Sequence, residues 1–127
     1  MSGPKWLLDT NVVIGLLKGH ETAIRLAESV QLELDKAAVS QITRMELLGF
    51  PQLGESEAIQ INNFLACCQV FLLDEQIEEQ AIRLRRSSGL KLPDAIIAAT
   101  SIIKKLDLLT LDGDLLERTI TYTGKMT

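Results

Sequence analysis

The chain has 127 residues and a formal net charge of −4, and 46% of its residues are hydrophobic. This length and balance predict one globular domain over residues 1–127, long enough to bury a real core. The acidic balance excludes a general coat of positive charge for nucleic acid, and an aromatic content of 4% argues against a base-stacking surface as the main binding device.

The apolar stretches and the cysteines of the chain indicate its cellular compartment. The longest uncharged run, residues 58–73, is too short to span a bilayer, and no signal peptide is recognisable at the N-terminus. Cys67 and Cys68 are adjacent and are the only cysteines, so we expect reduced, buried thiols rather than a disulfide. These features predict a cytoplasmic protein with no membrane partner.

Short apolar runs alternate with amphipathic segments along the chain. In chain order we predict a strand at 6–8, helices at 12–18 and 21–33, a strand at 37–39, a helix from 40 or 41 to 48, a helix at 56–66, a strand at 69–73, helices at 75–87 and 93–104, a strand at 106–110, a turn or short helix at 114–116 and an edge strand at 119–123. Strands separated by helices indicate βαβ units, and therefore an α/β fold with a mostly parallel sheet covered by helices on both faces.

Four acidic residues stand where these elements end or begin, and they are Asp9, Glu46, Asp94 and Asp112. Ligand sites in parallel sheets lie beyond the carboxyl ends of the strands, so the four side chains can share one crevice. Carboxylates brought together repel one another, and a divalent cation removes that repulsion. Oxygen-only ligands favour Mg²⁺ or Mn²⁺. Taken singly, each acid also has a structural explanation as a helix cap, turn former, helix-dipole partner or surface group.

Polar residues accompany these acids. Asn11 and Thr110 stand beside Asp9 and Asp112, and Thr43 precedes Glu46 by one helical turn. We interpret Asn11, Thr43 and Thr110 as groups that orient the carboxylates, with helix capping as an equal alternative for Asn11. The single histidine, His20, lies in a polar connection and is interpreted as a surface residue rather than a general base.

The acids occur within four short motifs, at residues 8–11 (LDTN), 40–46 (SQITRME), 92–100 (LPDAIIAAT) and 109–114 (LTLDGD). In this order they resemble the motifs of PIN-domain proteins, and in particular VapC-type toxins of bacterial toxin–antitoxin pairs, over residues 6 to about 116. The resemblance implies a ribonuclease-H-like, three-layer α/β/α sandwich and a metal-dependent endoribonuclease whose acidic quartet is Asp9, Glu46, Asp94 and Asp112. An aromatic residue often follows the last acid in this family. Here Leu115 follows Asp114, so Asp114 stays a further candidate metal ligand.

Substrate and partner surfaces are less sharply marked. Arg85, Arg86 and Lys91 cluster just before Asp94, where they are candidates for contacts to RNA phosphates, although a solvated helix face is the simpler explanation. Apolar residues at 47–50 and around Ile59, Phe64 and Leu65 exceed what a small core needs. They suggest a homodimer interface or a groove for a partner such as a cognate antitoxin.

Two other functions compete with the ribonuclease prediction. A haloacid-dehalogenase-like phosphatase also carries an acid after its first strand, but it needs a second Asp two positions later, and this chain has Asn11 there. A non-catalytic RNA-binding or assembly module with a PIN fold would be favoured by loss of one acid, and all four acids are present.

Overall fold

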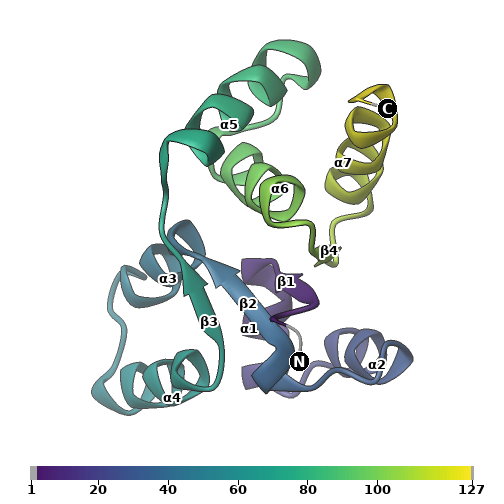
Figure 1. The fold of residues 1–127 in the computed structure, drawn as a ribbon. Coiled ribbons are helices and arrows are strands. Elements are labelled where there is room, and N and C mark those ends of the chain that lie inside the picture. Colours follow the sequence, from purple (N-terminus) through teal and green to yellow (C-terminus); the bar gives the residue numbers. More distant parts are fainter. Residues whose placement is uncertain (1–2, 127) are drawn as a thin grey trace.

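The computed structural model describes residues 3–126, with side chains through residue 123. Its sheet has four parallel strands in the order β3-β2-β1-β4 (Figure 1). The strands are β1 (Trp6–Leu8), β2 (Ala37–Ser40), β3 (Gln69–Phe71) and β4 (Asp107–Leu109). The helices are α1 (Thr10–Leu17), α2 (Glu21–Ser29), α3 (Gln41–Leu48), α4 (Glu55–Ala66), α5 (Glu75–Ser88), α6 (Leu92–Lys104) and α7 (Gly113–Met126), and a short 3-10 helix spans Leu34–Lys36.

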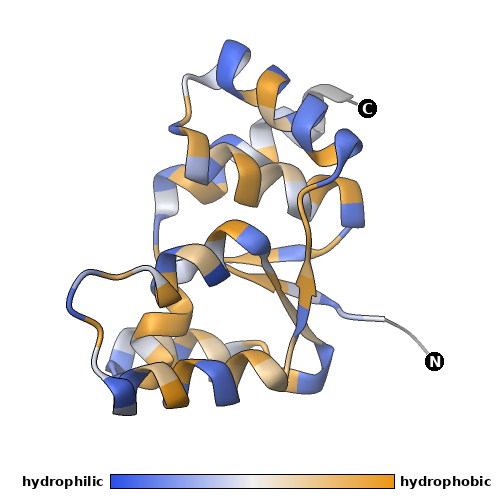
Figure 2. Ribbon diagram, turned by 90° about the vertical axis from the view of Figure 1, so that its left-hand side faces the viewer, coloured by the Kyte–Doolittle hydropathy of each residue, from blue (hydrophilic) through white to orange (hydrophobic). Residues whose placement is uncertain are grey.

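The alternation of side chains along β1 builds two apolar cores on opposite faces of the sheet. Leu7 points to a core formed with α5, α6 and α7, whereas Trp6 and Leu8 point to a core formed with α1, α3 and α4. In the turned view of Figure 2 the strands lie between these two groups of helices. The predicted three-layer α/β/α arrangement is therefore confirmed, and every strand pair in the sheet is parallel.

The C-terminal segment differs from the prediction, because residues 119–123 belong to helix α7 and not to an edge strand. The Thr, Ile and Tyr residues of this segment favour strands locally. However, Leu115, Thr119 and Tyr122 recur at helical spacing and face the core. The Thr119 hydroxyl donates to the Leu115 carbonyl at 2.7 Å, and the Thr123 hydroxyl donates to the Thr119 carbonyl at 2.9 Å, which satisfies both side chains within the helix.

The second helix is shorter than predicted, and Ala23 anchors it to the core. It ends at Ser29, and Gln31 has a positive φ of 54° that stops the helix from continuing. Ala23 is fully buried, whereas Ile24 is exposed. A Cβ atom at Gly15 would lie 2.5 Å from the Ala23 Cβ atom, so the close crossing of α1 and α2 depends on that glycine. This contact rotates Ile24 away from the core.

Two further predictions concern the cysteines and the membrane. Both thiols are free, but Cys67 is exposed and Cys68 is only partly buried, so the expectation of buried thiols is wrong. They follow the last residue of α4, where Cys67 is the C-terminal cap and turns outward. Burial is the main cause that raises the pKa of the Cys68 thiol, to about 11. Within residues 3–126, no helix is long and apolar enough to cross a membrane.

Candidate metal centre

The acidic residues lie at the carboxyl end of the sheet, on both sides of β1. Strands β2 and β3 lie on one side of β1 and β4 lies on the other, so the order of the strands reverses at β1. The Asp9 amide donates to the Leu109 carbonyl at 2.9 Å, which ties the ends of β1 and β4 together. Crevices at such reversal points are the usual ligand sites of parallel α/β sheets.

Asp9 is the central and most buried acid, with 5% of its surface exposed. Its Oδ1 accepts from the Thr10 amide at 2.7 Å, which caps α1, and its Oδ2 accepts from the Thr110 hydroxyl at 2.7 Å. Burial raises the pKa of Asp9, the two hydrogen bonds oppose this rise, and the charges of Glu46 and Asp112 add to it. Asp9 is thus both a helix cap and a charge held close to other acids.

Asp112 and the polar residues around it form a connected network. Asp112 Oδ1 accepts from the amides of Asp114 and Leu115, at 3.0 and 3.2 Å, at the start of α7. The Thr110 hydroxyl accepts from the Asp112 amide at 2.9 Å and from Asn11 Nδ2 at 3.4 Å. Asn11 Oδ1 also accepts from the Leu111 amide at 3.1 Å. Asn11 therefore braces the loop after β4, and the cap of α1 is Asp9.

Asp114, the further candidate ligand, faces a different partner. Arg118 Nε lies 3.1 Å from one Asp114 carboxylate oxygen, and Arg118 Nη1 donates to the Ser88 carbonyl at 2.6 Å. The Asp114 side chain is 68% exposed. Arg118 thus joins the first turn of α7 to the end of α5, and it engages the charge of Asp114 on the surface of α7.

Asp94 lies in the first turn of α6, after Pro93, and is half-buried. Burial raises the pKa of its carboxyl, the charges of Asp9 and Asp112 raise it further, and the nearby Lys91 opposes them. These influences place Asp94 within electrostatic reach of two other acids. Among the side chains that the structure describes, none forms a hydrogen bond with the Asp94 carboxylate.

Glu46 is exposed on α3, and its carboxylate is reached by a residue that the sequence reasoning missed. Thr10 Oγ1 donates to Glu46 Oε1 at 2.7 Å, and Thr10 Oγ1 lies 3.0 Å from Thr43 Oγ1. Thr43 is fully buried. It therefore acts on Glu46 through Thr10 rather than directly. The only signal for Thr10 in the sequence is a hydroxyl directly after Asp9 at the start of a helix.

The donor set suits a hard divalent ion. In the part of the chain that the structure describes, no three His, Cys, Asp or Glu side chains are gathered closely enough to hold a metal ion together. Burial raises the pKa of Asp9 and of Asp94, and the charges of neighbouring acids raise both further, so an added positive charge would relieve the site. All of the available ligand atoms are oxygens, as Mg²⁺ and Mn²⁺ require. The residues present thus fit such an ion chemically.

The predicted RNA contacts surround the start of α6. Arg85 and Arg86 are in the last turn of α5, Lys91 caps α6, and all three side chains are exposed. Arg85 Nε donates to the Leu90 carbonyl at 3.3 Å, which holds this arginine against the α5–α6 connection. Lys104 lies at the other end of α6, 3.8 Å from Asp74, so it is separated from Asp94 by the length of that helix.

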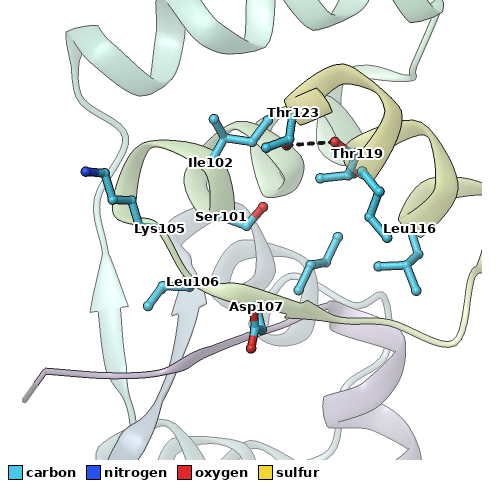
Figure 3. A pocket seen from close by; sticks show the side chains of 10 residues that line it. Ser101, Ile102, Lys105, Leu106, Asp107, Leu116, Thr119 and Thr123 are labelled. Carbon is cyan, nitrogen blue, oxygen red and sulfur yellow. Dashed lines mark hydrogen bonds between the residues drawn. The ribbon is translucent and has the colours of Figure 1, made fainter. Parts of the chain in front are cut away.

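Two concave surfaces differ in their relation to the four acids. A cavity of about 710 Å³ lies between the C-terminal part of α6, β4 and α7, and Figure 3 shows the apolar side chains of Ile102, Leu106 and Leu116 in its wall beside polar ones such as Ser101, Thr119 and Thr123. Its only acid is Asp107, at the amino end of β4 and away from the four acids. A smaller groove of about 120 Å³ runs between α1, α3 and α4, and its lining includes Glu46 and Phe50.

The fold and the acid arrangement together define a class of protein. The sequence pattern of the PIN domain matches residues 6–120, and the chain belongs to this family. The predicted resemblance is thereby confirmed, and the haloacid-dehalogenase-like alternative loses its basis.

Individual proteins that are similar to this chain indicate which kind of PIN-domain protein it resembles. The chain is 31% identical over 109 residues to Ribonuclease VapC19 of Mycobacterium tuberculosis, a match that covers 82% of this chain and 86% of that protein. It is also 31% identical to a chain in a toxin–antitoxin complex from Klebsiella pneumoniae, with a TM-score of 0.73 and coverage of 85% and 87% of the two chains. DNA-bound VapBC from Salmonella typhimurium, at 23% identity, a TM-score of 0.75 and coverage of 91% and 92%, shares the fold.

Proposed function

We propose that this protein is an endoribonuclease that hydrolyses RNA phosphodiester bonds with Mg²⁺ or Mn²⁺, and that it is the toxin of a toxin–antitoxin pair. One feature of the molecule carries the proposal. Burial raises the pKa of Asp9 and of Asp94 at the carboxyl end of the sheet, and neighbouring acids raise both further: Glu46 and Asp112 act on Asp9, and Asp9 and Asp112 act on Asp94. Membership of the PIN family and the likeness to Ribonuclease VapC19 support the same reaction.

The residues around the proposed metal site have two roles, binding the ion and orienting the residues that bind it. Asp9, Glu46, Asp94 and Asp112 would hold the ion. Thr110 orients the Asp9 carboxylate directly, whereas Asn11 acts through Thr110 and Thr43 acts through Thr10. A bound divalent ion supplies the positive charge that lowers the pKa of water and stabilises the charge that develops on the phosphate. We do not assign Asp114 as a principal ligand, because its charge is engaged by Arg118.

The RNA backbone is held next to this site. A protein of net charge −4 needs a local positive surface to hold a polyanion. Arg85, Arg86 and Lys91 supply it, since they precede Asp94 and Lys91 acts electrostatically on that acid. Guanidinium groups suit phosphate because their N–H donors match its oxygens.

The antitoxin is proposed to occupy the groove between α1, α3 and α4. Phe50 lines this groove and is exposed, whereas Leu47 and Leu65 are core residues and Phe64 is partly buried. Ile59 is also exposed but does not line the groove. Glu46 lines the same groove, so a partner segment bound there would also cover an active-site carboxylate. A homodimer and a cytoplasmic location remain predictions from the sequence.

The ribonuclease proposal is tested with purified protein and a labelled RNA. We expect cleavage in the presence of Mn²⁺, loss of cleavage on adding a chelator, and loss of cleavage in Glu46→Ala. Asp107→Asn, which alters an exposed carboxylate at the amino end of β4, serves as the matched control and should cleave normally. Cleavage that survives the chelator, or that persists undiminished in Glu46→Ala, would contradict the metal mechanism. RNA binding without any cleavage would favour the non-catalytic module.

The partner proposal has its own test. Co-expression with its cognate antitoxin should give a complex that purifies together and does not cleave RNA. Phe50→Asp should prevent that complex while leaving metal-dependent cleavage intact, because Phe50 is exposed and outside the acid site. A complex of unchanged affinity in Phe50→Asp would move the partner to another surface.

A further inference from the structure

We infer that Thr10 is the positioning residue of the site: it holds Asp9 and Glu46 in one fixed arrangement, so that the two acids bind the divalent ion together. The inference rests on the proposed function and assigns a role to a residue outside the acidic quartet. Asp9 ends β1 and Glu46 belongs to α3, so their relative position depends on contacts across the fold.

The geometry joins Thr10 to both acids at once. Its amide donates to Asp9 Oδ1 at 2.7 Å, and its hydroxyl donates to Glu46 Oε1 at 2.7 Å. Both acceptors are carboxylate oxygens, which form shorter and stronger hydrogen bonds than neutral acceptors do. One residue therefore fixes one oxygen of each acid and leaves the other Glu46 oxygen free for a cation.

The hydroxyl protons in this contact can be assigned by counting. Thr10 has one hydroxyl proton, and its oxygen lies near both Glu46 Oε1, at 2.7 Å, and Thr43 Oγ1, at 3.0 Å. The carboxylate is the closer and stronger acceptor, so the Thr10 proton is directed mainly to Glu46, and Thr43 Oγ1 is a second, weaker acceptor for it. Because Thr43 is fully buried, it holds the Thr10 hydroxyl in this orientation.

Glu46 depends on this contact more than Asp9 does. Asp9 has a second donor in the Thr110 hydroxyl and is almost fully buried, so it stays in place without the Thr10 side chain. Glu46 is exposed and has a longer side chain with more rotamers. The hydrogen bond from the Thr10 backbone amide to Asp9 forms with any residue except proline at position 10. Removing only the Thr10 hydroxyl therefore tests its effect on Glu46 alone.

The experiment compares Thr10→Val, which keeps the shape but loses the hydroxyl, with Thr10→Ser, which keeps the hydroxyl. Calorimetry of Mn²⁺ binding without RNA should show a loss of affinity of roughly 10- to 100-fold in Thr10→Val, the usual scale for groups that orient metal ligands. The kcat for RNA cleavage should fall with it while KM changes little, because RNA contacts are untouched. Thr10→Ser should restore both. Thr22→Val, at an exposed position of α2, is the matched control.

Substitution of Thr43 tests the same hydrogen bonds at a second position, so that the conclusion does not depend on the folding of Thr10→Val alone. Thr43→Val should weaken Mn²⁺ binding less than Thr10→Val, and the double variant should be no worse than Thr10→Val, because both changes act on one chain of hydrogen bonds. Wild-type Mn²⁺ affinity in Thr10→Val, or an equal loss in Thr10→Ser, would overturn the inference. If the wild type binds Mn²⁺ but leaves RNA intact, the ribonuclease proposal fails and the Mn²⁺ comparison still decides the role of Thr10. If the wild type binds no Mn²⁺, both fail.

Discussion

The acids in the site are held in two different ways. Asp9, Glu46 and Asp112 each accept a hydrogen bond from a neighbouring residue, so their carboxylates are oriented before any ion arrives. Asp94 is placed by the first turn of α6 and is related to the other acids mainly through charge. Asp9, Glu46 and Asp112 thus form a preorganised half of the site, and Asp94 alone forms an adjustable half.

This difference has an energetic consequence. Preorganised ligands lose little conformational freedom when they bind an ion, but their removal leaves buried donors without partners. A carboxylate held near like charges costs stability in the metal-free protein, and its removal relieves repulsion. Substitutions in the two halves should therefore have similar effects on catalysis and opposite effects on stability.

The largest combined effect is expected from Asp9→Ala. Cleavage of RNA should fall by at least roughly a hundredfold, because a central ligand is lost. The free energy of unfolding without metal should also fall, by about 1–2 kcal/mol, since the Thr10 amide and the Thr110 hydroxyl lose their acceptor. Cleavage rates and urea unfolding measure the two effects. Unchanged unfolding would mean that these hydrogen bonds add no net stability.

Asp94→Asn should separate catalysis from stability. Cleavage should again fall by roughly a hundredfold or more, while the metal-free protein should unfold at the same or a higher temperature. The rise in melting temperature produced by Mn²⁺ should become smaller, because an ion stabilises the folded state only as far as it binds it. A metal-free melting temperature lowered as much as in Asp9→Ala would show that the two halves are held alike.

The pH dependence of the free energy of unfolding, measured without metal, tests the same difference between Asp9 and Asp94. The folded-state pKa of Asp94 is raised above 3.8, so the folded protein binds more protons than the unfolded chain between 3.8 and the raised pKa. The stability contributed by Asp94 is therefore present at low pH and is lost as pH rises through the folded-state pKa. We expect the stability gain of Asp94→Asn over the wild type to be near zero at about pH 3.5 and to grow toward pH 7. A gain that stays constant in urea unfolding across this range would contradict the charge explanation.

The smallest effect is expected from substitutions of the proposed RNA-contact residues near Asp94. In the double variant Arg85→Ala/Arg86→Ala, the dependence of RNA affinity on salt should become shallower by about one to two units of log–log slope. KM should rise more than kcat falls, because binding common to ground and transition states is lost. The variant Arg25→Ala/Lys36→Ala removes the same charge from α2 and the 3-10 helix, away from the crevice, and should keep the wild-type slope. Equal slopes in all three proteins would place the RNA elsewhere.

Local sequence patterns were sufficient for much of the fold. The apolar runs that became β1, β2 and β4 and the inward face of α5, with Ile77, Ala81 and Leu84, follow from short-range periodicity. The positions of the four acids relative to these elements follow from the same pattern. The segment 119–123 was predicted wrongly, because β-branched residues favour a strand locally and only packing against the core makes it a helix.

The sequence by itself determined which residues carry carboxylates and that they follow or begin regular elements. Only the tertiary structure decided which partners hold them. Thr110 reaches Asp9 across 101 positions, and Thr10 reaches Glu46 across 36 positions. The pairing of Asp114 with Arg118, by contrast, is local, because the two residues are four positions apart on α7. Periodicity is a local property of the chain, whereas a hydrogen bond between distant residues depends on strand order and helix placement, which no short segment contains.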